Sequence, residues 1–487
     1  MSSAAPVSAY RISAFEGSVV VLTVLVFPIV LYAAHRVGHA QLLYPAVNVL
    51  VALCLYARRS PWYAGQCVLL FCFVSLVRRL VDAQAGWNPS SPVLLTPYLC
   101  CLLATLGFLR YWLQSNPRYI GVFLCMLLCI AYGVAMAMFQ GRTLASLVDA
   151  LKWSFGPIYA VYILSEAERH AELRRVIETC LVWAGAAMGA YGVVQYVFLP
   201  IWDAEWMRNV AQLGMDSIGQ PEPFAVRVFS TMNSPGSFGI VMMAGIVLGL
   251  KRPMLVVVLT IPLMLIGLAL CQYRSLWAAT ALAVAMVVFQ RRAALPLANV
   301  LVLVAMGVVA LGTIASVPRI REAIVHRAHT LTKLKSDESL KSRLAQYGEL
   351  TRNDNLVAGE GLALNGASRR LDKGKVAAID GALIEIWRGM GVFVGTTFLL
   401  CIGVLVVSLL FLPPSLGSDI YYDRAIILAT FIQLPMGSVH TGEMGFDAWM
   451  FIGFGLAALI AYRSRAAPAS VPSPAGWLQP RYGVADA

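Results

Sequence analysis

Two arginines stand beside turns in an otherwise apolar sequence, and together they could hold an anion. Arg274, in the stretch LCQYRSLWAAT, separates two apolar runs with almost no loop between them. Arg227 opens the stretch RVFSTMNSPGSFG, in which Asn233, Ser234 and Pro235 precede the next apolar run. Asparagine and serine are favoured helix caps and proline is favoured at the first helical position, so this pattern predicts a helix N-terminus beside Arg227. Guanidinium groups next to such a terminus favour negative charge.

The anion that best fits this chemistry is a phosphate or pyrophosphate at the membrane surface. Guanidinium forks match phosphate oxygens bidentately, and lipid-linked pyrophosphates are the natural substrates at that depth. An arginine within a span costs about 2.5–3.5 kcal/mol on insertion scales, which marks Arg274 as a functional candidate. Two other interpretations stay open. Arg274 could be an interface anchor that snorkels, and the phosphate could belong to a structural lipid headgroup.

The composition predicts that these residues sit in a helical membrane protein. Of 487 residues, 59% are hydrophobic and 13% are charged, and the mean hydropathy is +0.73. Many apolar runs approach the roughly 20 residues that cross a bilayer as a helix, and short alternating strands of a barrel are not evident. The first run, 17–34, is interpreted as a retained span rather than a cleaved signal.

Splitting the sequence at charged or turn-rich breaks predicts about fourteen membrane spans. Their approximate ranges are 17–34, 41–57, 61–77, 93–114, 119–139, 144–165, 176–198, 234–250, 253–272, 275–290, 294–317, 390–412, 425–440 and 444–462. The formal charge of +12 resides mainly in short basic pairs between these runs, which argues against nucleic acid and follows the positive-inside rule. The unequal distribution of basic residues between the two sides predicts an orientation with both termini inside. Basic residues expected outside are fewer, chiefly Arg36, Arg78, Arg79 and Arg142.

This topology divides the chain into four parts. Residues 1–317 form a transmembrane bundle with an outer loop at about 199–233. Residues 318–380 form a large outer loop or cap, 381–465 the C-terminal transmembrane helices, and 466–487 a Pro- and Ala-rich tail expected to be a disordered cytoplasmic segment. The ten cysteines lie mostly in apolar runs, where a thiol packs as a small hydrophobe.

No metal or cofactor is predicted. Carboxylates on the outer side could ligate a metal, among them Asp203 with Glu205 and Glu443 with Asp447, but carboxylates on a wet loop are usually solvated. The pair His326 and His329 lacks further ligands nearby. Glu385, Arg388 and His440 lie near the predicted outer face, either as pocket walls or as packing.

Three stretches resemble motifs of the O-antigen ligase and polysaccharide polymerase superfamily. RVFSTMNSPGSFG is similar to the arginine-containing pattern that ends in Asn-Pro-Asn, with the asparagine displaced. YRSLWAA resembles the family's Ser-Arg-Gly helix start. SRLAQYGELTRNDNLVAGEGLAL, followed by IDGALIEIWRGMGVFVG, resembles the arginine, Gly-x-Gly and final block that precede a span. Together the matches cover about residues 220–412.

The resemblance implies an all-α polytopic glycosyltransferase of the GT-C type, without a metal. Carried over, Arg227 and Arg274 would hold the donor pyrophosphate, and Arg343 would precede the Gly359-x-Gly361 turn. Asp380 stands where ligases carry histidine, as in the polymerase variant. Next to a span it could take the proton of the acceptor hydroxyl as general base; the alternative is an N-cap for the helix that follows. Gly359, Gly361, Arg343 and Arg388 are the expected substrate-binding residues.

The favoured function is polymerisation of undecaprenyl-pyrophosphate-linked oligosaccharide at the periplasmic face of a bacterial inner membrane, yielding O-antigen or exopolysaccharide. A chain-length regulator and a flippase are the expected protein partners. One alternative is a ligase that moves finished glycan to lipid A core or to protein. The other is a flippase or exporter of lipid-linked sugars, although transporters usually place charges near the midplane and often show repeated halves.

Overall fold

Every regular element in the described part of the chain is helical. The computed structural model describes residues 13–114, 119–212, 218–290, 295–316, 338–351, 355–364, 379, 381–411 and 417–466. Within them, the one strand-like pairing is an isolated bridge between Gly219 and Val226. The prediction of an all-α polytopic membrane protein is confirmed at that level; the predicted tail, His326, His329 and Asp380 lie outside the described residues.

The first half of the chain forms long helices joined by short turns. Helix α1 passes through a five-residue π-helical turn into α2, so the two make one continuous stretch, Ala14–Ala33. The bounds are α1 (Ala14–Val21), α2 (Phe27–Ala33), α3 (Ala40–Ala57), α4 (Trp62–Ala85), α5 (Thr96–Cys101), α6 (Ala104–Trp112), α7 (Ile120–Phe139), α8 (Thr143–Ser165), α9 (His170–Phe198) and α10 (Ile201–Ala211).

The second half contains shorter apolar helices and two long ones. The bounds are α11 (Pro235–Gly249), α12 (Met254–Leu270), α13 (Arg274–Val288), α14 (Leu297–Ser316), α16 (Glu338–Thr351), α17 (Ala382–Leu410), α18 (Asp419–Phe431) and α19 (Gly442–Ala466). Each predicted span therefore overlaps a helix, although the predicted span at 425–440 is helical only as far as Phe431. The predicted outer loop at 199–233 is not simply a loop, because it contains α10.

Eight helical stretches in the described residues are long and apolar enough to cross a membrane. They are Ala14–Ala33, Ala40–Ala57, Trp62–Ala85, Pro92–Trp112, Ile120–Phe139, Ala167–Phe198, Ala382–Leu410 and Gly442–Arg463. Four further apolar helices are shorter: Pro235–Gly249, Met254–Leu270, Arg274–Val288 and Leu297–Val309. The count of fourteen spans stays a prediction.

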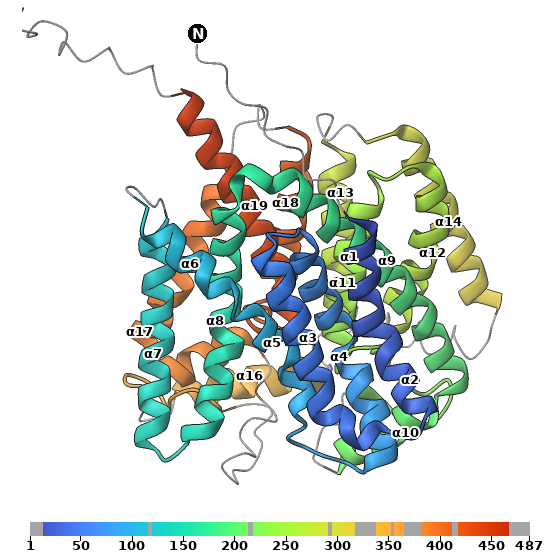
Figure 1. Cartoon of the computed structure of the whole chain (residues 1–487), viewed down its shortest axis with the longest axis horizontal. Helices are drawn as coiled ribbons and strands as arrows, with labels where there is room; N and C mark the ends of the chain where they lie inside the picture. Colours follow the sequence, from blue (N-terminus) through green and yellow to red (C-terminus); the bar gives the residue numbers. More distant parts are fainter. Residues whose placement is uncertain are drawn as a thin grey trace, which may run out of the picture.

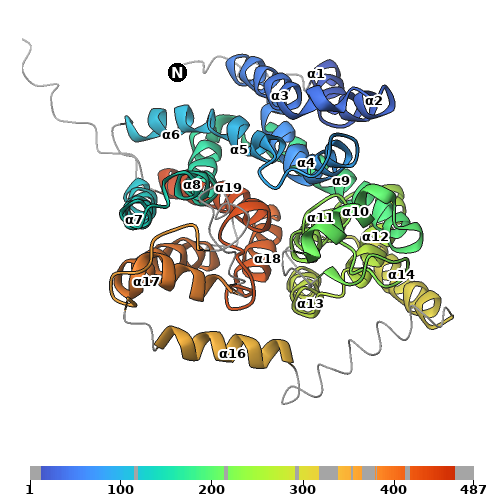
Figure 2. The same ribbon diagram turned by 90° about the horizontal axis from the view of Figure 1, so that it is seen from below.

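The long helices run from one end of the molecule to the other, and α10 and α16 lie near a common end (Figure 1). Viewed from below, α16 lies flat at the edge of the molecule beside α17 (Figure 2). Because successive helices alternate in direction, α8, α11, α13, α17 and α19 all begin at this end, which we call the outer end. It is the end predicted to lie outside.

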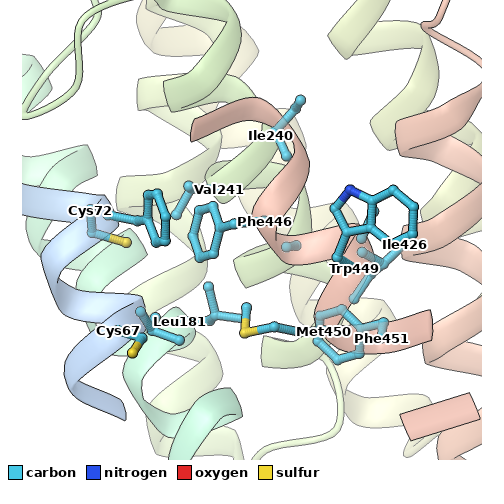
Figure 3. Packing of buried hydrophobic residues seen from close by; sticks show 14 of the residues in the cluster. Cys67, Cys72, Leu181, Ile240, Val241, Ile426, Phe446, Trp449, Met450 and Phe451 are labelled. Atoms are coloured by element: carbon cyan, nitrogen blue, oxygen red, sulfur yellow. The ribbon is translucent and has the colours of Figure 1, made fainter. Parts of the chain in front are cut away.

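The core lies where α4, α9, α11 and α19 meet, and its packing is visible in Figure 3. Phe71 stacks on Phe446 with ring centroids 4.9 Å apart, and Trp449 is fully buried. Large apolar side chains on other helices point outward, as at Phe139 and Phe411, which suits a surface that faces lipid. Eight of the ten cysteines are buried, as their apolar surroundings predict.

Helix α17 is divided by a kink at Gly391. Its φ of +76° and ψ of +166° are not helical, so residues before and after it form two separate helical pieces. An ideal Cβ on Gly391 would lie 2.2 Å from the Val357 carbonyl oxygen. Only glycine combines this positive φ with so close an approach of another backbone segment. The kink therefore makes room for the chain at 355–364.

Ion pairs tie helix ends together at the opposite, inner end. Arg174 of α9 forms a bidentate pair with Asp423 of α18, at 2.8 and 2.7 Å. Glu178 of α9 accepts from Lys251, which also pairs with Asp419 at 2.9 Å. Three cationic groups at this end, Arg174, Lys251 and Arg252, are thus paired with carboxylates.

Candidate functional site

Arg227 and Arg274 lie near one another at the outer end. The backbone N–H of Val228 donates to the carbonyl of Leu270 at 3.1 Å, so the loop that carries Arg227 is fastened to the last residue of α12. Arg274 begins α13 after only three intervening residues. Burial, and then the charge of Arg274, lower the pKa of Arg227 below its ordinary value. The two half-buried arginines from separate elements therefore share one electrostatic environment.

The N-terminus of α11 has the cap that the sequence predicts. Ser234 has extended backbone angles, its Oγ accepts from the N–H of Ser237 at 3.0 Å, and Pro235 occupies the first helical position. Asn233, the other possible cap, instead donates from Nδ2 to Glu443 Oε1 at 3.4 Å. A helix N-terminus thus begins in the same loop as Arg227, which adds to the positive field of that region.

A buried ion pair holds the loop between Arg227 and α11 in place. Arg79 of α4 and Asp203 of α10 are both fully buried, with Nε and Oδ1 3.1 Å apart. Arg79 also donates from Nη1 to the carbonyl of Met232 at 3.0 Å and from Nη2 to that of Ser230. Asp203 was expected to be a solvated loop carboxylate; that interpretation is wrong, because α10 folds it against α4.

Gln195 of α9 connects the ion pair to the backbone of the loop. Its Nε2 donates to Asp203 Oδ2 at 2.7 Å, and its Oε1 accepts from the N–H groups of Phe229 and Ser230 at 3.1 and 2.8 Å. Tyr191 donates to the same carboxylate oxygen at 2.8 Å. These bonds satisfy backbone groups that would otherwise be buried without partners, so the loop that ends in α11 is rigidly held.

The segment 433–438 lies between Arg274 and the start of α17. On one side, the Tyr273 hydroxyl donates to the Met436 carbonyl and the Ser275 hydroxyl to Gln433 Oε1, each at 3.0 Å. On the other side, the N–H of Ala382 donates to the Leu434 carbonyl at 2.8 Å. Asp380 itself is outside the described residues, so its role stays a prediction.

The Gly359-x-Gly361 turn packs between α7 and the kink of α17. The N–H groups of Glu360 and Gly361 donate to the carbonyls of Arg388 and Gly389 at 2.6 and 2.8 Å. Both glycines have positive φ, +80° and +79°. A Cβ on Gly359 would lie 2.3 Å from the Gly391 nitrogen, and one on Gly361 would lie 2.2 Å from the Ala137 nitrogen. These glycines thus have a packing role, and their predicted contact with substrate stays a prediction.

Arg388 forms an ion pair within the same unit. Its Nη2 donates to both oxygens of Glu360, at 2.9 and 3.0 Å, and its Nε donates to Oε1 at 3.1 Å. Arg142, at the start of α8, donates to the carbonyls of Glu360 and Leu362. Arg388 is therefore partnered within the chain. Arg343 lies on α16, and its side chain is outside the described part of the structure.

A polar cluster on α8, α17 and α19 was not recognised from the sequence. Lys152 pairs with Asp149 at 3.3 Å, and its backbone carbonyl accepts from the hydroxyl of Thr441, two residues before Glu443, at 2.7 Å. Ser438 donates to Glu385, and Ser75 donates to Glu443 at 2.9 Å. We call Asp149, Lys152, Glu385, Ser438 and Glu443 the Lys152 cluster. Glu385 and Glu443 stand out in the sequence as separate candidates near the predicted outer face, whereas Asp149 and Lys152 lie within an apolar run. No local pattern joins these members, because they are distant in sequence.

No family model matches the chain, and neither the curated proteins nor the solved structures include one that is significantly similar to it.

Proposed function

We propose that the chain is a membrane glycosyltransferase that polymerises undecaprenyl-pyrophosphate-linked oligosaccharide repeat units at the periplasmic face of a bacterial inner membrane. The observation that carries the proposal is the proximity of the two arginine-bearing segments: Val228, next to Arg227, donates to the carbonyl of Leu270, and Arg274 begins α13 after the short turn that follows. Two guanidinium groups at one end of a membrane bundle suit a pyrophosphate on a lipid.

The proposed reaction is a displacement at the anomeric carbon of the donor sugar. An acceptor hydroxyl oxygen forms a bond to that carbon, the carbon–oxygen bond to the pyrophosphate breaks, and the electron pair leaves with undecaprenyl pyrophosphate. Arg227 and Arg274 would stabilise the charge that grows on the leaving group, an effect worth roughly 3–4 kcal/mol for each preorganised donor. Asp380 would accept the hydroxyl proton.

Rigidity of the arginine-bearing loop supports this role. Electrostatic catalysis requires donors that do not reorganise during the reaction. The Arg79–Asp203 ion pair and Gln195 hold the backbone of residues 229–232, two positions after Arg227. The Leu270 carbonyl, four residues before Arg274, accepts from Val228. The two backbone segments that carry the arginines are therefore tied to each other by a hydrogen bond.

The direct test uses purified chain in lipid nanodiscs with lipid-linked oligosaccharide extracted from the native host. A ladder of longer lipid-linked products supports polymerisation. Transfer that requires added lipid A core or protein would identify a ligase instead. Movement of lipid-linked sugar across a vesicle membrane without any new glycosidic bond would identify a flippase and reject the enzyme.

A further inference from the structure

We propose that the Lys152 cluster binds the acceptor sugar, through its hydroxyl or amino groups, beside the arginine pair that holds the pyrophosphate. This assignment rests on the proposed function and adds a binding site for the phosphate-free part of the substrate. The cluster gathers polar side chains from α8, α17, α19 and the segment before α19 at the outer end of an apolar bundle.

The hydrogen-bonding groups of the cluster suit a sugar better than a phosphate. Asp149, Glu385 and Glu443 contribute carboxyl groups, and Lys152, which pairs with Asp149, is the only cationic member of the cluster. Carboxyl oxygens accept hydrogen bonds, and an ionised phosphate has few or no protons to donate to them. Sugar hydroxyls and ammonium groups do donate hydrogen bonds, so the cluster suits these groups. The arginine pair has the opposite character, so the two regions suit different parts of one glycolipid.

The carboxyl groups are positioned by short contacts rather than solvated. Ser438 donates to Oε2 of Glu385, while Ser75 and Asn233 both donate to Oε1 of Glu443. Glu385 and Glu443 are half-buried, and the Lys152 side chain is 30% exposed. The cluster is therefore both anchored and reachable, as a binding site must be.

Buried polar groups without partners adjoin the cluster. Asp447, one turn beyond Glu443 on the same face of α19, is fully buried, and neither carboxylate oxygen has a hydrogen-bond partner. His440 is 1% exposed, and neither ring nitrogen has a partner; its ring lies 4.3 Å from that of Trp153, the residue after Lys152. Buried polar atoms are nearly always satisfied, so such groups point to a ligand or water that completes the site.

The geometry also joins this cluster to the arginine pair. Met436 accepts from Tyr273, the neighbour of Arg274, and Ser438 donates to Glu385. Only Gly437 separates the two contacts along the chain. Two residues of extended chain span at most about 7 Å, which is comparable with the size of one sugar ring. Tyr273, the neighbour of Arg274, and Glu385 thus contact one short segment, and the proposal assigns the donor head and the acceptor sugar to the regions that this segment joins.

The test compares two probes on the full chain in nanodiscs. One probe is undecaprenyl pyrophosphate, and the other is the phosphate-free oligosaccharide released by mild acid from the host's lipid-linked pool. In Glu385→Gln and Lys152→Met, we expect oligosaccharide affinity to fall by about tenfold or more, because each loses charge-assisted hydrogen bonds. The affinity for undecaprenyl pyrophosphate should change less than about twofold, because the proposal assigns the pyrophosphate to the arginines and not to the Lys152 cluster. Arg274→Lys should instead lower the affinity for undecaprenyl pyrophosphate and leave the affinity for the oligosaccharide nearly unchanged.

A matched control is Glu222→Gln, which neutralises an exposed carboxylate in the loop before Arg227. It should leave the affinity for both probes unchanged. Unchanged oligosaccharide affinity in both cluster variants overturns this inference, and so does an equal loss for both probes. Failure of the proposed function looks different, because the wild-type chain would then neither bind undecaprenyl pyrophosphate nor extend lipid-linked oligosaccharide.

Discussion

Arg79 and Asp203 form an ion pair in which neither side chain is exposed. Arg79 also donates to the carbonyl of Met232, in the loop that follows Arg227. The two residues come from α4 and α10, and Phe229 lies against the guanidinium, with its ring centroid 4.8 Å from Cζ. A pair so placed couples the stability of the bundle to the position of the loop that carries Arg227.

We expect Asp203→Asn to destabilise the protein by about 3–5 kcal/mol, because it leaves the Arg79 charge buried without its counter-ion. Thermal unfolding followed by size-exclusion chromatography measures this. Glu222→Gln, on an exposed part of the same outer end, is the control and should unfold like the wild type. Equal thermal stability of the two variants would contradict the structural role of the ion pair.

Arg274→Lys should reduce chain extension by about 10²–10³-fold while membrane insertion stays normal, because an ammonium group cannot reproduce a bidentate fork. Ladder formation from lipid-linked oligosaccharide measures the loss. Arg227→Lys should have the same effect, since the proposed function assigns both guanidinium groups to one pyrophosphate. Wild-type extension in Arg274→Lys would show that this residue is only an interface anchor.

Gly361→Ala should destabilise the protein by roughly 1–3 kcal/mol or more, because alanine is strained at φ +79° and its Cβ would meet the Ala137 backbone. Gly403→Ala is the matched control. Gly403 lies on α17 with nothing within 4 Å of an added Cβ, so its replacement should be neutral or slightly stabilising. The melting temperatures of the two variants measure the difference. Equal melting temperatures would contradict the packing role of Gly361.

Asp380→Asn should retain a helix cap yet lose about 10²–10⁴-fold in rate if Asp380 accepts the hydroxyl proton. The binding of undecaprenyl pyrophosphate should be unchanged, because that group is addressed by the arginines. Rates at several pH values test the role further, since removing a general base removes the acidic limb of the profile. A fully active Asp380→Asn variant rejects the catalytic role.

Much of the helical architecture follows from local sequence. Apolar runs predict the helices, and the caps at Ser234 and Pro235 fix the start of α11. The short turn before Arg274 follows from the absence of loop residues. These features depend on neighbours in the chain, and hydropathy and capping preferences report them directly.

The features that the sequence did not predict depend on residues far apart in the chain. Asp203 looked like a solvated loop carboxylate, because nothing near it reveals that α10 folds back against Arg79. The Lys152 cluster joins helices from both halves of the chain. The packing role of Gly359 and Gly361 depends on α7, which no local pattern indicates.

The break at Gly391 has a mechanical consequence for α17. In an unbroken helix each inserted residue rotates everything beyond it by about 100°. Because the helical rotation is interrupted at Gly391, the piece after it is not rigidly coupled to the piece before it. The second piece can change in length or composition while Glu385 and Arg388 keep their orientation toward their partners. The two pieces can therefore diverge independently: the second can follow the thickness of the bilayer while the first keeps its contacts with the chain at 355–364.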